Sequence, residues 1–193
     1  MSLANQDLQF LLELGSGQPW GRLPVAQMLG DMTRVKAEFT RFLENGGRVM
    51  VGPNPILNFD VPSFIPNSWE IRESDQIQSR VKGRWELILN KIGHHLDLGQ
   101  KARKVIRGHE LKQSLDGQPV LPAHVLDYLL EHPELIPEAW KGKAVFFWGT
   151  IYRGAGGNLY VRYLYWDGDR WHWLYSWLDN GWCESHPSAV SAS

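Results

Sequence analysis

The sequence is poor in cysteine, in long apolar runs and in net charge, and each shortage excludes a class of protein. Its single cysteine, Cys183, can form neither an internal disulfide nor a cysteine-rich zinc site. No apolar run approaches the roughly 20 residues that a membrane-spanning helix requires, and the first residues lack the basic region and cleavage site of a signal peptide. The 20 basic and 21 acidic side chains give a formal charge of −1, too small for a general phosphate-binding surface. We therefore expect a cytoplasmic globular protein without a membrane span.

Residues with the chemistry for catalysis or metal binding do not fall into a suitable pattern. His94 and His95 are adjacent, so on a helix they would project about 100° apart and could not share a metal. Cys183 is close in sequence to His186, but proximity along the chain is not the geometry of a catalytic triad. The glycine-rich segment 154–157 precedes a strand instead of a helix and lacks the Lys-Ser/Thr of a phosphate-binding loop. The sequence predicts no catalytic residue, no metal and no cofactor.

Aromatic residues, in contrast, are abundant and unevenly placed. The chain has ten Trp, six Tyr and seven Phe, and 13 of these 23 residues lie between Phe146 and Trp182. Trp20, Trp69, Trp85 and Trp140 are dispersed, and we expect them to pack the body of the protein. The remaining tryptophans either build a core beneath a sheet or frame an exposed platform, and both interpretations stay open.

Three segments near the C-terminus are rich in residues that favour strands: 144–153, 159–166 and 169–178. Glycine-rich residues 154–158 separate the first two. Asp167-Gly168 separates the second and third, and Asp-Gly between two such runs is a strong hairpin signal. The sequence therefore predicts a three-stranded antiparallel aromatic meander.

A two-residue turn at Asp167-Gly168 predicts the pairing of the second and third strands. The expected cross-strand partners are Leu164 with Trp171, Arg162 with Trp173, and Tyr160 with Tyr175. Arg162 would then lie over an indole ring. Because a longer turn would exchange the two faces, the sequence does not decide which face is exposed.

The part of the chain before residue 100 has mainly helical patterns. Apolar residues at three- and four-residue spacing predict a helix over 24–43, preceded by a shorter one in 3–14. The further expectations are a strand over 48–51, an extended proline-rich segment over 52–68, a short strand and one helical turn in 101–115, and a helix over 122–131. The pattern in 74–98 suits both a helix and a strand, and we expect a helix in its first part. The predicted fold class is α+β, with a helical N-terminal region (1–100) and a C-terminal α+β region (101–193) that ends in the aromatic meander.

Residues 80–112 carry an excess of basic side chains: Arg80, Lys82, Arg84, Lys91, Lys101, Arg103, Lys104, Arg107 and Lys112, against Glu86, Asp97 and Glu110. Such an excess could contact phosphates, and aromatic rings nearby could stack on bases. Single-stranded nucleic-acid binding is therefore an alternative function, although the neutral total charge favours an ordinary solvated surface.

Over about its last 90 residues the chain resembles a family of small uncharacterised bacterial proteins. The resemblance rests on Gly108–Leu111, Pro119–Leu121, Val125–Leu130, His132–Glu138, Trp140–Lys143, Phe147–Arg153, Val161–Trp166, and the tail with Trp171, Trp173, Trp177, Leu178, Trp182, Pro187 and Ala189. It implies a frame of Trp, Leu, Pro and Ala that surrounds varying positions, a pattern similar to the target proteins of diversity-generating retroelements. The chain has no C-type-lectin signature, so the resemblance does not imply a lectin-like fold.

The resemblance implies that the residues between the frame positions bind a partner. These candidate ligand-binding residues are Asp169, Arg170, His172, Leu174, Tyr175, Ser176, Asn180, Gly181, Ser185 and His186. Their mainly short polar side chains, set between tryptophans, independently favour a surface position. The predicted function is that of a non-enzymatic binding protein whose C-terminal aromatic surface contacts a macromolecular partner, a protein or a glycan.

Overall fold

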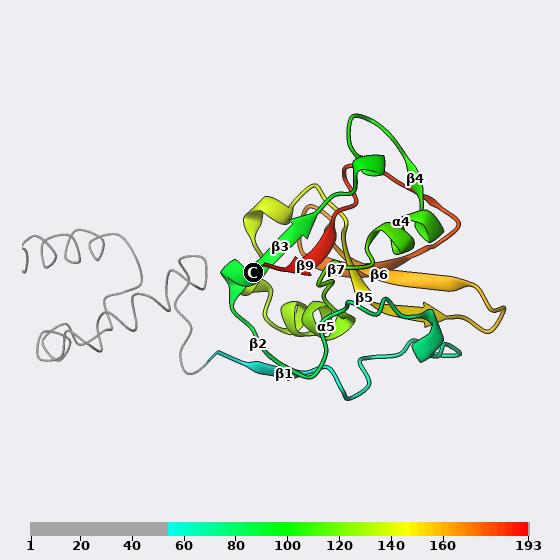
Figure 1. Cartoon of the computed structure of the whole chain (residues 1–193). Coiled ribbons are helices and arrows are strands. Elements are labelled where there is room, and N and C mark those ends of the chain that lie inside the picture. Colours follow the sequence, from blue (N-terminus) through cyan, green and yellow to red (C-terminus); the bar gives the residue numbers. More distant parts are fainter. Residues whose placement is uncertain (1–53, 193) are drawn as a thin grey trace, which may run out of the picture. The chain divides into compact units, whose positions relative to one another are not determined.

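A five-stranded mixed sheet is the central element of the computed structural model, which describes residues 54–192 (Figure 1). The strand order is β3-β9-β5-β6-β7. The strands are β3 (Ile92–His95), β9 (Ser188–Ser191), β5 (Val145–Arg153), β6 (Leu159–Trp166) and β7 (Trp171–Trp177). Only β5 and β9 run parallel, and the other neighbours are antiparallel. The pairing of β3 with β9 brings residues before position 100 into the same sheet as the C-terminal aromatic strands.

Smaller elements surround this sheet. Strand β1 (Ile56–Asn58) pairs with β2 (Arg84–Glu86), and β4 (Ile106–Arg107) pairs with β8 (Gly181–Trp182). The α-helices are α4 (Gly108–Ser114) and α5 (Ala123–Glu131). Short 3-10 helices are η2 (Glu73–Asp75), η3 (Leu89–Lys91), η4 (Leu98–Gln100), η5 (Pro133–Leu135) and η6 (Glu138–Trp140).

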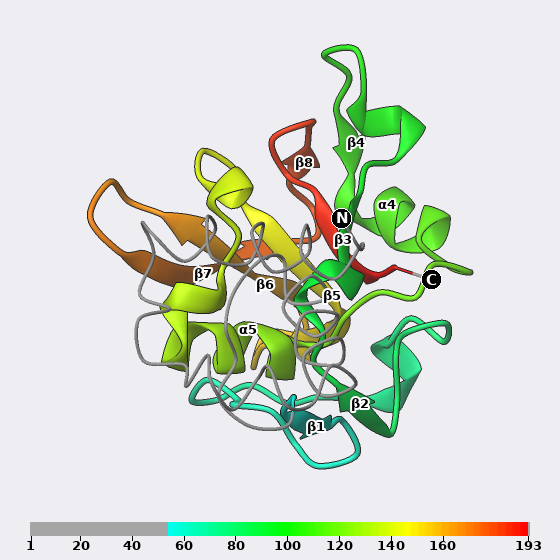
Figure 2. The same ribbon diagram turned by 90° about the vertical axis from the view of Figure 1, so that its left-hand side faces the viewer.

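The alternation of side chains along β5 creates a core on each face of the sheet. Val145 and Phe147 pack toward α5 with Leu126, whereas Phe146 and Trp148 belong to a second core. The second core includes residues of α4 and β8, which lie on the side of the sheet away from α5 (Figure 2). Because both faces of the sheet are covered at β5, this strand consists of a nearly continuous run of apolar residues.

An irregularity in β5 attaches α5 to the sheet. The register with β6 shifts between Phe146 and Ile151, and the shifted segment contains Gly149 and Thr150. The amide of Gly149 donates to the Leu121 carbonyl at 3.0 Å, and Thr150 Oγ1 accepts a hydrogen bond from the amide of Ala123 at 3.0 Å. These bonds satisfy backbone groups at the start of α5 and fix where the helix begins.

The prediction of a mainly helical N-terminal region is wrong for residues 54–100, the part of that region that the structure describes, because these residues contain no α-helix. Residues 74–98, expected to begin as a helix, instead contain η2, β2, η3 and β3. Gly83 adopts a φ of +76°, which interrupts any helix there, and β1 and β9 supply strand partners from distant parts of the sequence. The elements predicted over 3–14, 24–43 and 48–51 lie outside the described residues. The described chain is sheet-rich, and its three aromatic strands belong to a larger mixed sheet.

The predicted register of the β6–β7 hairpin is displaced by two residues. The structure pairs Leu164 with Trp173, Arg162 with Tyr175, and Tyr160 with Trp177. The connection contains four residues, 167–170, because the last paired residues are Trp166 and Trp171, and the amide of Asp167 donates across it to the Arg170 carbonyl at 3.2 Å. The expectation that a longer turn would exchange the two faces is therefore wrong here, because a displacement by two residues leaves every side chain on its predicted face of the sheet.

Candidate binding surface

A buried arginine organises the α5-facing side of β6 and β7. Arg162 is 1% exposed, and its Nη2 lies 2.7 Å from Oδ1 of Asp127 on α5. Its guanidinium carbon lies 4.2 Å from the centre of the Trp173 ring, which confirms the expectation that Arg162 lies over an indole ring. Its Nη1 donates to the Tyr152 hydroxyl at 3.4 Å, and burial raises the pKa of Tyr152. This network holds α5 against the hairpin.

Beside Arg162, four aromatic side chains form what we call the aromatic cluster: Trp69, Tyr160, Tyr175 and Trp177. Trp69 stacks on Tyr160 with ring centres 4.5 Å apart and meets the edge of Tyr175 at 4.8 Å. Tyr160 also stacks on Trp177 at 6.3 Å. Tyr175 remains 44% exposed and Trp177 39% exposed, so the rings are held by one another while part of their surface meets solvent.

The opposite face of the hairpin carries a second, more mixed surface. Tyr163 and Tyr165 of β6 are partly buried, and Leu174 of β7 is 45% exposed. Tyr163 packs on Phe146 with ring centres 4.6 Å apart, and Tyr165 stacks on His172 at 5.7 Å. Both faces of β7 therefore present large side chains to solvent.

The turn before β7 is stiffened by one carboxylate. Asp167 Oδ1 accepts hydrogen bonds from the amides of Asp169 at 2.8 Å and Arg170 at 2.9 Å, while Oδ2 lies 2.6 Å from Nε2 of His172. The hydrogen bonds from the backbone of Arg170 and Asp169, followed by the contact with His172, lower the pKa of Asp167 to about 2. The turn therefore contains a fixed negative charge at neutral pH.

None of the ten candidate ligand-binding residues is buried, and the structure brings some of them, but not all, together. His172, Leu174 and Ser176 share one face of β7, and Tyr175 lies on the other. Arg170 in the turn donates from Nε to Nε2 of His172 at 3.0 Å, and Asn180 donates from Nδ2 to Oγ of Ser176 at 3.1 Å, so both adjoin that face. The others lie elsewhere: Asp169 in the turn, Gly181 in β8, and Ser185 and His186 between β8 and β9.

Gly181 and His186 pack against other segments of the chain. A Cβ on Gly181 would lie 2.5 Å from Cγ1 of Val105, so this position packs closely against the residue that precedes β4. The ring of His186 packs edge-on against Phe146, and its Nδ1 accepts a hydrogen bond from the amide of Cys183 at 3.2 Å. Burial lowers the pKa of His186.

The outer edge of β7 is a feature that sequence reasoning did not identify. Among the described residues no strand pairs with this edge. The amide of Leu178 donates to the Leu159 carbonyl at 3.0 Å, which makes the even-numbered residues of β7 the hydrogen-bonded partners of β6. Since such bonds alternate in an antiparallel pair, the backbone amides and carbonyls of Trp171, Trp173 and Tyr175 point away from β6.

A polar depression of about 350 Å³ lies near the aromatic cluster, lined by Ser68, Trp69, Glu70, Arg72, Arg153, Gly154, Ala155 and Gly157. The Arg153 guanidinium already has two hydrogen-bond acceptors within the protein. Its Nε donates to Asp75 at 2.8 Å, and its Nη1 donates to the Gly157 carbonyl at 2.8 Å. The Arg153 guanidinium holds the pKa of Asp75 below its usual range. Segments 68–72 and 153–157 meet only through tertiary structure, so no local sequence signal marks this depression.

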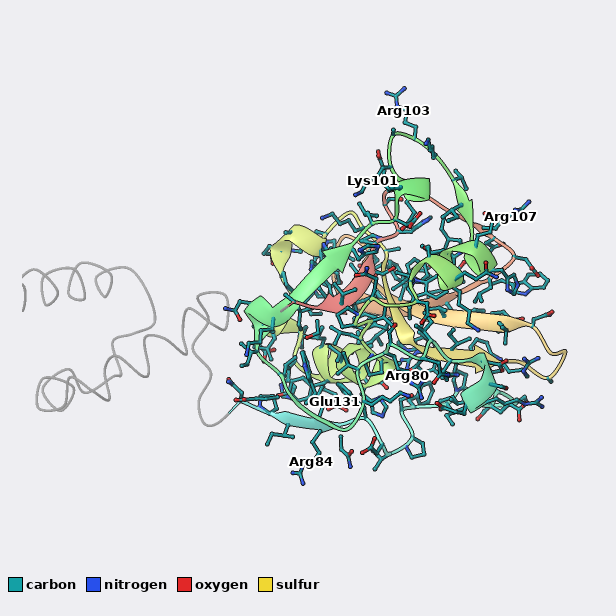
Figure 3. All side chains as sticks on the ribbon, viewed as in Figure 1. Arg80, Arg84, Lys101, Arg103, Arg107 and Glu131 are labelled. Atoms are coloured by element: carbon teal, nitrogen blue, oxygen red, sulfur yellow. The ribbon has the colours of Figure 1, made fainter. Side chains whose placement is uncertain are left out.

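The basic residues of 80–112 do not share one surface. Arg84 and Arg103 extend from opposite sides of the molecule (Figure 3). Arg80 is engaged by Glu73, with Nη2 and Oε2 2.6 Å apart. The basic residues of 80–112 therefore do not form one continuous surface, and nucleic-acid binding stays a prediction.

Within residues 54–192 no group of three or more His, Cys, Asp or Glu side chains is placed to hold a metal ion. The same residues contain no helix with the length and apolar character needed to cross a bilayer. Comparisons with protein-family models, with curated proteins and with solved structures give no significant match. The function is therefore argued from the geometry of this chain.

Proposed function

We propose that the protein is a non-enzymatic binding protein that contacts a macromolecular partner through the aromatic surface around β7. The observation that supports this most directly is the exposure of Leu174, Tyr175 and Trp177, which flank an unpaired sheet edge. Tyr175 and Trp177 both contact Tyr160 on one face, and adjoining large side chains that remain exposed favour an interaction site over ordinary surface. The aromatic cluster also loses little side-chain entropy on binding, because its rings already hold one another in place.

A protein partner fits this edge better than a glycan. An extended peptide segment can pair with the outward backbone groups of Trp171, Trp173 and Tyr175 and extend the sheet by one strand. Side chains of that segment would alternate between the Tyr175 face and the Leu174 face of β7. Strand β7 contains no proline and no Lys, Arg, Asp or Glu, which are the residues that commonly protect an edge from pairing.

The experiment separates edge pairing from simple contact with the rings. A random peptide library displayed on phage is panned against the full chain, and the affinity of the selected peptides is measured by fluorescence anisotropy. Tyr175→Ala removes the ring but keeps the outward amide, whereas Tyr175→Pro removes both and leaves the bonds to β6 intact. We expect Tyr175→Ala to weaken binding about tenfold and Tyr175→Pro to weaken it by a further factor of about ten.

The matched control is Arg84→Ala, an exposed position on the β1–β2 sheet, which should bind like the unmodified chain. If no library peptide binds, or if Tyr175→Pro and Tyr175→Ala bind equally, partner binding by strand addition is contradicted.

A further inference from the structure

The segment 97–107, which contains η4, a tip and β4, projects as a loop from the rest of the described chain (Figures 1 and 2). Its tip, residues 101–105, is entirely exposed. The amide of Lys104 donates to the Lys101 carbonyl at 3.2 Å, and the two residues between them, Ala102 and Arg103, have φ values of 56° and 62°. The tip is therefore a tight turn whose central residues both have left-handed backbone conformations.

The base of this projecting loop is firmly attached to the C-terminal segment. Gln100 is fully buried, and its Nε2 donates to the carbonyls of Cys183 at 3.1 Å and His186 at 2.7 Å. On the other side, β4 pairs with β8, where Ile106 lies opposite Trp182. The loop is thus presented on a fixed support.

The loop combines positive charge with exposed aliphatic side chains. Its four basic side chains are Lys101, Arg103, Lys104 and Arg107, and its one carboxylate, Asp97, accepts a hydrogen bond from the amide of Gly99 at 2.6 Å. Figure 3 shows Arg103 at the outermost point of the loop, with Lys101 and Arg107 on its two sides. Leu98 is 77% exposed and Val105 66% exposed, the two highest values among the large exposed hydrophobic residues in the part of the chain that the structure describes.

These features distinguish between two kinds of anionic partner. A single-stranded nucleic acid is bound by basic side chains together with aromatic rings that stack on its bases, but the loop contains no aromatic residue. An anionic bilayer attracts basic side chains to its headgroups and accepts aliphatic side chains at the acyl boundary. Leu98 and Val105 therefore have a use at a lipid surface that they lack on a phosphate backbone.

We propose that the projecting loop 97–107 docks the protein on the surface of an anionic lipid bilayer. Lys101, Arg103 and Lys104 contact the headgroups, and Leu98 and Val105 enter the interface. This docking uses a part of the molecule other than β7, so it is independent of the proposed partner binding.

The test is co-sedimentation of the full chain with vesicles of phosphatidylcholine alone and of phosphatidylcholine mixed with phosphatidylglycerol, at low and high salt. We expect binding only to the mixed vesicles, and a decrease at high salt because the charges are exposed. Each basic side chain near such a surface contributes about fivefold to partitioning, so R103E/K104E should reduce it at least about 20-fold. Leu98→Ala should reduce it severalfold without changing the net charge.

The matched control is K82E/R84E, which changes the net charge by the same amount on the β1–β2 side of the molecule. Retention of vesicle binding by this control, together with its loss in R103E/K104E, supports the proposal. Equal binding to both kinds of vesicle, equal loss in the control, or no effect of Leu98→Ala overturns it. Binding of a labelled oligo(dT) that R103E/K104E abolishes, with no vesicle binding, would assign the loop to nucleic acid instead.

Discussion

Arg162 and Asp127 illustrate how a single charged pair supports this hairpin. Arg162 is almost completely buried, its carboxylate partner Asp127 is partly exposed, and the ring of Trp173 covers the guanidinium. Removing the carboxylate would leave a buried cation without its counter-charge, which costs far more than the net contribution of the pair itself.

We predict that Asp127→Ala lowers the free energy of unfolding by about 3 kcal/mol, measured by urea denaturation. The double variant R162M/D127L, which replaces both charges by apolar side chains of similar size, should recover much of this loss. A loss below about 1 kcal/mol in Asp127→Ala would mean that solvent reaches Arg162 and would contradict the burial argument.

Asp167 is the residue for which the structure predicts a pH dependence. Its pKa is about 2 in the folded protein against an ordinary value of 3.8, so the unfolded chain binds a proton before the folded chain does. The stabilisation is present above pH 3.8 and is lost as the pH falls through about 2. Thermal unfolding measured across this range should therefore show a steeper decrease in Tm for the unmodified chain than for Asp167→Asn. Parallel curves for the two proteins would show that the turn does not stabilise the ionised carboxylate.

The tryptophans show that position in the fold decides the role of a residue type. For Trp148 and Trp182 the sequence leaves a core and an exposed platform open, and both rings are fully buried in the core that contains α4. Trp69 was expected to pack the body, and it instead stacks on Tyr160 in the aromatic cluster. A ring of the same chemistry is core or surface according to the segments that pack against it.

At the scale of elements, the irregular part of β5 depends on one glycine. A Cβ at Gly149 would lie 2.5 Å from the nitrogen of Pro122 and 2.6 Å from the carbonyl carbon of Leu121. Both are backbone atoms at the start of α5, so they cannot move aside without shifting the helix.

We predict that Gly149→Ala lowers the free energy of unfolding by at least about 3 kcal/mol, measured by chemical denaturation. Gly156→Ala, in the β5–β6 connection, is the matched control, because its nearest neighbour would be the Asn158 side chain at 3.7 Å. That control should change stability by less than about 1 kcal/mol. Equal effects of the two variants would contradict the close packing of α5 on β5.

The element predictions that agree with the structure are those supported by strong local signals. Pro122 precedes α5, and the buried residues Val125, Leu126 and Leu129 recur with helical spacing. The aromatic strands β5, β6 and β7 are likewise marked by their composition and by the glycine-containing turns between them. Residues 74–98 had a weaker pattern that suited both helix and strand, and strand pairing with β1 and β9 decided the outcome.

At the scale of the whole molecule, the order of strands in the sheet determines which strand edge is left open for binding. Ile92 pairs with Ser191 at one end of the sheet, and β7 is left at the other end with its outer edge open. The projecting loop is supported by Gln100 and β4, away from that edge. The two proposed contacts can therefore be tested by separate variants of the same chain.

The sequence by itself determined that the C-terminal third forms aromatic strands, which side chains of β6 and β7 share a face, and where α5 begins, because these depend on alternation and on turn residues close together in the chain. The register of the hairpin followed from the hydrogen bonds of a four-residue turn, which composition does not specify. Only the tertiary structure decided that Trp148 is buried, that Tyr175 is exposed, and that loop 97–107 projects. Each of these depends on contacts between segments far apart in sequence, and such contacts override local preference.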